Sequence, residues 1–240
     1  MLIIPAIDLQ GGSVVRLVQG YKGKKVYSKD PVRVAKSWVR QGAKFLHLVD
    51  LDGAFGGSPK NLKSVEDILQ AIKIPVEFGG GVRSIDAIKN ILKLGVARVV
   101  LGTKAVEDKG FLKKAFAKFG DKIIVGVDAK EGKVMVKGWK AGYKNTDALE
   151  FSLYLKKIGF KEMIYTDTLK DGTLSGPNIG EIKRLLKLTG LRIVASGGVS
   201  RLGDLDKLGK LSKSGLSGVI IGKALYEGRF TLPEALKSTM

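Results

Sequence analysis

The sequence predicts an α/β chain that forms a single (β/α)8 barrel, and two observations carry this prediction. Eight short apolar runs alternate with longer amphipathic stretches along the 240 residues, a pattern typical of strand–helix units around a parallel sheet. The second half of the chain also repeats features of the first at an almost constant spacing. Such a repeat favours a closed ring of eight strands over the competing open, doubly wound sheet.

The predicted strands are too short to be helices and are rich in Val and Ile, as expected for strands buried on both faces. They cover residues 2–7, 45–50, 75–78, 98–101, 122–127, 161–166, 191–195 and 218–221. The predicted helices cover residues 31–42, 62–73, 84–95, 107–118, 147–158, 179–188, 203–211 and 231–238. The first helix is well marked, because Asp30 offers a cap, Pro31 takes the first helical position and Gly42 ends it.

The repeat consists of matching residues in the two halves of the chain. The pairs that are 117 residues apart are Asp30 and Asp147, Gly42 and Gly159, Asp50 and Asp167, Asn61 and Asn178, and the Gly-Gly-Val runs at 80–82 and 197–199. Asp8 and Asp128 are 120 residues apart, as are the strand ends at 99–102 and 219–222. We therefore expect one domain over residues 1–240, made of two half-barrels that cover about 1–120 and 121–240.

Composition excludes several classes of site. The chain has no cysteine and one histidine, His47, which excludes disulfides, thiolate chemistry and a metal site with several histidines. The chain has no apolar run of about 18 residues and its first residues do not resemble a signal peptide, so we expect a cytoplasmic protein without a membrane partner.

The net charge of +19 favours anionic partners. Nucleic-acid binding is one interpretation of this charge. The lysines are spread over all predicted helices, however, and the sequence contains no recognised nucleic-acid-binding motif, so we expect no nucleic-acid partner.

Two aspartates are the candidate catalytic residues. Asp8 and Asp128 end the first and fifth predicted strands, which are opposite each other in a ring of eight, and the ends of barrel strands are where active sites lie. Two carboxylates that face each other across a pocket can serve as acid and base. The alternative is that each aspartate only caps a loop.

Two groups of glycines predict binding sites for phosphate. They follow strands three and four in the first half, and strands seven and eight in the second. Glycine lets backbone N–H groups approach an anion closely, although glycine also serves simple tight turns. The candidate residues are Gly80, Gly81, Arg83, Gly102 and Thr103 in the first half, and Gly197, Gly198, Gly222 and Lys223 in the second.

Further candidates lie in loops at the same end of the barrel. Thr166 ends the sixth strand, and Asp171, Gly172 and Thr173 lie in the loop after it. Arg16 is a candidate anion contact in the first loop, and its alternative is a solvated surface position. Trp139 is a candidate for stacking on a heterocycle, and its alternative is packing at the rim. His47, between two leucines of the second strand, is interpreted as structural.

Several motifs along the chain form a set. They are Ile-Ile-Pro-Ala-Ile-Asp-Leu at 3–9 with Val-Arg-Leu at 15–17, His-Leu-Val-Asp-Leu-Asp-Gly-Ala at 47–54, Phe-Gly-Gly-Gly-Val-Arg at 78–83, Asp-Gly-Thr at 171–173 and Ala-Ser-Gly-Gly-Val at 195–199. Together they resemble the HisA family, the isomerases of histidine biosynthesis. The resemblance covers essentially the whole chain, with the motifs in order and at suitable spacing.

The resemblance implies an Amadori rearrangement of an aminoaldose to an aminoketose. The substrate would be the doubly phosphorylated ribonucleotide ProFAR, with Asp128 as general acid, Asp8 as the base at C2′ and Thr166 beside them. It implies an enzyme that needs no metal or cofactor, and we expect a monomer. Two relatives remain as alternatives. One is the cyclase of the same pathway, although residues 5–8 and 49–54 favour the isomerase. The other is a bifunctional isomerase that also accepts phosphoribosylanthranilate.

Overall fold

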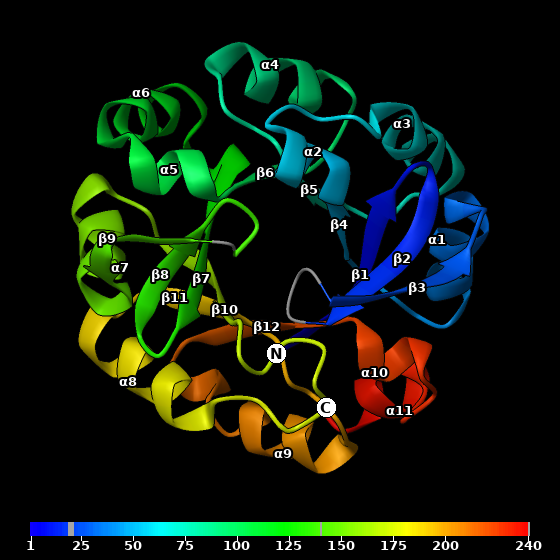
Figure 1. The fold of residues 1–240 in the computed structure, drawn as a ribbon. Coiled ribbons are helices and arrows are strands. Elements are labelled where there is room, and N and C mark those ends of the chain that lie inside the picture. The colour runs from blue at the N-terminus through cyan, green and yellow to red at the C-terminus, as the bar shows by residue number, and fades with distance from the viewer. Residues whose placement is uncertain (19–21, 140, 240) are drawn as a thin grey trace.

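A computed structural model describes residues 1–18, 22–139 and 141–239 (Figure 1). Within these residues, eight parallel strands close into a ring in which each strand pairs with the next and the last with the first. In ring order they are β1 (Leu2–Gln10), β4 (Leu46–Asp50), β5 (Val76–Gly79), β6 (Arg98–Leu101), β7 (Ile123–Lys130), β10 (Glu162–Asp167), β11 (Arg192–Ser196) and β12 (Leu216–Ile221). The predicted (β/α)8 barrel is confirmed.

Helices surround this ring on the outside (Figure 1). The helices expected from the sequence are α1 (Pro31–Arg40), α3 (Leu62–Ala71), α4 (Ile85–Lys93), α6 (Lys109–Phe119), α7 (Ala148–Ile158), α8 (Ile179–Thr189), α9 (Leu202–Gly209) and α11 (Leu232–Lys237). The predicted cap of α1 is present, because the Asp30 carboxylate accepts a hydrogen bond from the Arg33 N–H at 2.9 Å. Asp147 caps α7 in the same way, accepting from the Leu149 N–H at 2.8 Å.

The apolar core has two parts. The larger part lies between the strands and the helices and includes Ile7, Leu48 and Phe78. The smaller part fills the inside of the barrel with the buried side chains of Ile4, Ala6, Ile124, Ile164, Val194 and Ile220. Because neighbouring residues of a strand point to opposite faces, the strands contribute to both parts. The interior of the ring is thus filled with side chains, and in barrels of this kind the site lies at the carboxyl ends of the strands.

Two β-hairpins extend from the barrel where the sequence predicted loops. β2 (Ser13–Val18) and β3 (Lys22–Ser28) follow β1, and β8 (Lys133–Val136) and β9 (Ala141–Asp147) follow β7. β2 pairs antiparallel with β1, and β8 pairs antiparallel with β7. The sequence of β3, with three lysines in seven residues, lacks the apolar pattern of a buried strand, so periodicity did not reveal it.

Three short helices also begin close to the carboxyl ends of strands. They are α2 (Leu51–Gly56) after β4, α5 (Thr103–Glu107) after β6 and α10 (Lys223–Tyr226) after β12. Two turns of 3₁₀ helix, η1 (Gly120–Lys122) and η2 (Ser212–Ser214), precede β7 and β12. The short helices are too brief to show a helical period in the sequence.

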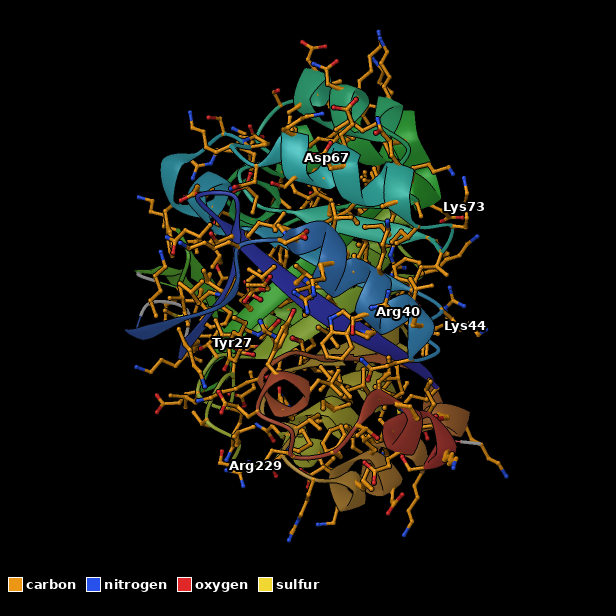
Figure 2. The ribbon with its side chains drawn as sticks, turned by 90° about the vertical axis from the view of Figure 1, so that its right-hand side faces the viewer. Tyr27, Arg40, Lys44, Asp67, Lys73 and Arg229 are labelled. Carbon is orange, nitrogen blue, oxygen red and sulfur yellow. The ribbon has the colours of Figure 1, made fainter. Side chains whose placement is uncertain are left out.

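The outer surface carries much of the positive charge. Arg40, Lys44 and Lys73 are exposed and project away from the barrel (Figure 2). No helix in the described part of the chain is both long enough and apolar enough to cross a membrane.

Candidate active site

A cavity of about 230 Å³ opens at the carboxyl ends of the barrel strands. Most of the candidate residues predicted from the sequence line it, whichever half of the chain they come from. They are Asp8, Arg16, Gly80, Gly81, Arg83, Gly102, Thr103, Asp128, Trp139, Thr166, Asp171, Gly172, Gly197, Gly198, Gly222 and Lys223. The barrel therefore brings together residues that are up to about 215 positions apart in the sequence, which is what strand-end positions in a closed ring predict.

Asp8 is buried near the end of β1 and forms an ion pair with an arginine of the first hairpin. The pairing of β1 with β2 places Val15 opposite Asp8. The next residue, Arg16, donates from Nη1 to Oδ2 of Asp8. Burial works against the charge on Arg16, yet the carboxylates of Asp8 and Asp171 outweigh it and raise the Arg16 pKa. Asp8 is thus the carboxylate partner of a firmly charged guanidinium.

The first hairpin is tied to α10, which holds Arg16 in place. The ring of Tyr27 on β3 lies 4.8 Å from the ring of Tyr226, measured between centroids. Next to it, Lys25 Nζ donates to Oε1 of Glu227 at 3.0 Å, and the Tyr27 hydroxyl donates to the same oxygen. The Arg16 guanidinium lies 5.9 Å from the centre of the Tyr226 ring, within the range of a cation–π contact.

Asp128 lies near the end of β7 in surroundings of another kind. Its neighbour across the strand pair is Thr166 of β10, and it accepts hydrogen bonds from the side chains of Thr166 and Trp139. Burial raises the Asp128 pKa above its ordinary value, although these two hydrogen bonds and the charge of His47 act in the opposite direction. Asp128 therefore retains a proton more readily than an exposed aspartate.

Asp171, which the sequence placed among the binding residues, is a third carboxyl group at the cavity. Burial raises its pKa to about 6, and although Arg16 acts in the opposite direction, the carboxylates of Asp8 and Asp128 raise it further. Three carboxyl groups therefore share one cavity, and Arg16 forms an ion pair with one of them, Asp8. A cluster of this kind is typical of sites that move protons.

The glycines at the strand ends are needed for close packing as well as for an open cavity. Gly80 has a φ of +115°, and a Cβ there would lie 2.2 Å from the carbonyl oxygen of Asp50. A Cβ at Gly222 would lie 0.8 Å from Nη2 of Arg16, so the guanidinium rests directly on this glycine. Gly102, in contrast, has no described atom within 4 Å of its Cβ position.

The two predicted phosphate sites therefore differ. At the first, Gly102 is open and Thr103 Oγ1 accepts a hydrogen bond from the Lys137 N–H at 2.9 Å. At the second, Arg16 covers Gly222, and Lys223 Nζ donates to the Gly172 carbonyl at 2.8 Å. Arg16 Nε is buried and has no hydrogen-bond partner among the described residues. The second site thus already contains two cationic side chains.

A family model described as histidine biosynthesis protein matches residues 2–231. The chain belongs to this family. Among its relatives are proteins from Alkaliphilus metalliredigens, 49% identical over 97% of both chains, and from Desulforudis audaxviator, 51% identical over 98% of this chain and 90% of the relative. A relative from Pelotomaculum thermopropionicum is 48% identical over 98% of this chain and 91% of its own length. The three are named as isomerases of an imidazole-4-carboxamide with two 5-phosphoribosyl groups.

Within this histidine-biosynthesis barrel, one candidate residue lies away from the cavity, and one residue interpreted as structural lies at it. Thr173 does not line the cavity, because its hydroxyl donates to the Lys170 carbonyl at 2.7 Å. Trp139 lines the cavity and has a φ of +68°, and its role in stacking stays a prediction. His47, interpreted as structural, also lines the cavity. The alternation of β4 could have revealed this, since Leu46 and Leu48 occupy the outer face and leave His47 on the inner one.

Other cavity residues of this family member carried no sequence signal. Phe55, Lys104 and Leu174 line the cavity, and none of them belongs to a pattern with a chemical interpretation. In the part of the chain that the structure describes, no group of three or more His, Cys, Asp or Glu residues could hold a metal ion.

Proposed function

We propose that this protein is an aldose–ketose isomerase that acts on ProFAR, an imidazole-4-carboxamide with two phosphoribosyl groups. The observation that carries the proposal is the pair of strand-end aspartates in one cavity, with Asp8 beside a guanidinium and the half-buried Asp128 beside Thr166 and Trp139. Because the neighbours of the two carboxyl groups differ, one group is suited to act as base and the other as acid. The names of the relatives support the same reaction.

Ring opening is the first step of the proposed mechanism. Asp128 donates its proton to the ribose ring oxygen, and the C1′–O4′ bond breaks with its electron pair moving to oxygen. The lone pair of the glycosylamine nitrogen forms the C1′=N bond of a Schiff base. Thr166 holds the Asp128 carboxyl group in position through the hydrogen bond between them. A positioned acid of this kind contributes about 10²–10⁴-fold to a rate.

Proton transfer at carbon follows. Asp8 takes the proton from C2′, the C2′–H electrons form a C1′=C2′ bond, and the electrons of the C=N bond return to nitrogen. The resulting enaminol becomes the aminoketose when C1′ gains a proton and the C2′ hydroxyl loses one. No atom is gained or lost overall, so the reaction needs positioned acids and bases and no further reactant.

The two phosphates fix the substrate across the cavity. We propose that Gly80, Gly81, Arg83, Gly102 and Thr103 bind one phosphate, and that Gly197, Gly198, Gly222, Lys223 and Arg16 bind the other. The buried Nε of Arg16 supports its assignment, because a phosphate oxygen would give this donor a partner. Anchoring both ends holds the reacting carbon between Asp8 and Asp128.

A specific observation favours a second assignment of the acid. The Asp171 pKa of about 6 is closer to neutral pH than that of an ordinary aspartate, as is typical of a general acid. We therefore include Asp171 as an alternative donor to the ring oxygen, alongside its proposed role in binding.

Isomerase activity on purified ProFAR tests these roles. Asp8→Asn should lower kcat by about 10²–10⁴-fold, and so should Asp128→Asn if it is the acid. Asp30→Asn, on the outside of the barrel, is the matched control and should retain activity, because asparagine is also a good helix cap. An unchanged kcat in Asp8→Asn would refute its role as base. If Asp171→Asn loses turnover and Asp128→Asn does not, Asp171 is the acid.

The same assay addresses the alternatives. Turnover of phosphoribosylanthranilate beside ProFAR would identify a bifunctional isomerase, and turnover of neither substrate by folded protein would contradict the proposal. We further propose a monomer in the cytoplasm that does not bind nucleic acid, which sedimentation and a salt-dependent binding assay with DNA and RNA can test.

A further inference from the structure

His47 lies on the inner face of the barrel and lines the cavity. A histidine that only packs in the core does not need this position. His47 lies on β4 opposite Ala6 of β1 and opposite Glu77 of β5. Its side chain is 11% exposed and lines the same cavity as Asp8 and Asp128. The imidazole therefore faces the space in which the sugar of the substrate would react.

Glu77 holds this imidazole by one nitrogen. The Glu77 side chain is completely buried, and its Oε1 lies 2.6 Å from Nδ1 of His47. Its Oε2 accepts a hydrogen bond from Nε of Arg98 at 2.6 Å. Arg98, which is opposite Glu77 on β6, continues to Glu162 of β10 through its Nη1. Each oxygen of the buried carboxylate thus has one partner that carries or can carry positive charge.

This arrangement determines which ring nitrogen holds a proton. Burial alone raises the Glu77 pKa, but the hydrogen bonds and charges of His47 and Arg98 outweigh it and hold the pKa below its ordinary value. An ionised carboxylate only accepts hydrogen bonds, so Nδ1 of His47 carries the hydrogen between the two groups. Nε2 is then the nitrogen that can exchange a proton with a ligand.

His47 is also coupled electrostatically to Asp128, the proposed acid. The proposed mechanism leaves Asp128 without its proton after ring opening, and the C2′ hydroxyl must later lose one. Because His47 and Asp128 line the same cavity, the imidazole can connect the two steps. It accepts the hydroxyl proton at Nε2 as the C2′=O bond forms, and returns that proton to Asp128.

We infer that His47 is a catalytic residue that carries the proton of the C2′ hydroxyl to Asp128, and that Glu77 is the positioning residue that directs its Nε2 into the cavity. The inference rests on the proposed isomerase function. The protons balance: the ring oxygen gains the proton of Asp128, Asp128 regains the hydroxyl proton through His47, and Asp8 transfers the C2′ proton to C1′. At the end of the cycle the enzyme has its starting protonation state, and the product contains the same atoms as the substrate.

The first test is the kinetics of variants on ProFAR. His47→Gln keeps a polar side chain but cannot carry the proton, and should lower kcat by about 10²-fold with KM changed less than about threefold. Glu77→Gln keeps an oxygen that accepts from Nδ1 and should retain kcat within about threefold, whereas Glu77→Leu should behave like His47→Gln. Ser152→Ala, an equally buried polar position on α7, is the control.

The second test follows deuterium placed at C2′ of the substrate. In His47→Gln, Asp8 still removes the label while ketone formation is slow, so recovered substrate should lose deuterium faster than product forms. A kcat of His47→Gln within about threefold of wild type would overturn the inference, and so would loss of both washout and turnover in that variant. Absence of turnover in the wild type would instead refute the proposed function. Because His47→Gln is tested independently, misfolding of Glu77→Leu leaves the inference falsifiable.

Discussion

The two halves of the barrel place an aspartate at corresponding strand ends and then surround it differently. The hairpin after β1 brings Arg16 to Asp8. At the corresponding position, the hairpin after β7 carries Val136, which is 3% exposed, and the residues beyond it bring Trp139 to Asp128. The strands therefore provide two similar carboxyl groups. The first hairpin pairs one of them with a cation, and Trp139, between the strands of the second hairpin, donates a hydrogen bond to the other. The chemical asymmetry of the site therefore comes from the hairpins together with Thr166 and His47 of the ring strands.

The two halves also differ in how they hold the loops behind the glycine clusters. Asp50 is completely buried and accepts hydrogen bonds from the backbone N–H groups of Gly53, Lys60 and Asn61 at 2.6–2.8 Å and from Asn61 Nδ2 at 2.7 Å. Its counterpart Asp167 accepts from the Leu169 N–H at 3.0 Å, the Lys170 N–H at 3.3 Å and Asn178 Nδ2 at 2.7 Å. The Asp–Asn pair is common to both halves, and the first pair is the more tightly bonded.

Removing these carboxylates should produce the largest difference between the halves. Asp50→Ala should lower the free energy of unfolding by about 3–5 kcal/mol, because it leaves several buried donors without a partner, and Asp167→Ala by about 1–2 kcal/mol. Urea denaturation of both variants measures the difference. Equal losses would contradict the interpretation that the first half is held more firmly.

Alanine at the matching glycines should have the next largest effect. Gly80→Ala should cost about 2–3 kcal/mol of unfolding free energy, because positive φ disfavours alanine and the new Cβ would overlap the Asp50 carbonyl. At Gly197, φ is +92° but the nearest atom, the Asp167 carbonyl oxygen, is 3.0 Å away, so Gly197→Ala should cost about 1–2 kcal/mol. Thermal denaturation of the pair decides the order, and a larger loss at Gly197 would reverse it.

The smallest effect concerns Asp171, whose counterpart in the first half, 117 residues earlier, is Ala54. Its pKa rises from 3.8 to about 6 on folding, so the folded state binds this proton more tightly than the unfolded state. The stability contributed by this proton is complete below about pH 4 and is lost as the pH rises through about 6.

For a group at the cavity surface we expect a loss of about 1–2 kcal/mol over that interval. Asp171→Asn should abolish this part of the pH dependence, and Asp30→Asn should leave it unchanged. Urea denaturation between pH 4 and pH 7 measures it, and identical curves for wild type and Asp171→Asn would contradict the assignment.

The barrel and most of its candidate site follow from local pattern. The composition of runs such as 122–127 predicts buried strands. Asp8 and Gly102 follow such runs, so closure of the strands into a ring places both at the same end of the barrel. The hairpin around Lys25 could not be predicted this way, because its strand β3 is polar and is stabilised by contacts with the region of α10 that are distant in sequence. The surroundings of His47 and Asp171 could not be predicted for a related reason. Their chemistry depends on Glu77 and on neighbouring carboxylates that only the closed ring brings near.

The apolar side chains that fill the barrel, such as Ile4, Ile124 and Ile164, limit the routes by which a ligand can enter and leave the site. They stop the cavity from continuing down the axis of the ring, so a ligand held at the strand ends has no passage through the middle. A substrate must arrive by the side from which its product departs. The next substrate molecule can therefore bind only after the product has dissociated. The loops around the opening of the cavity affect both substrate binding and product release.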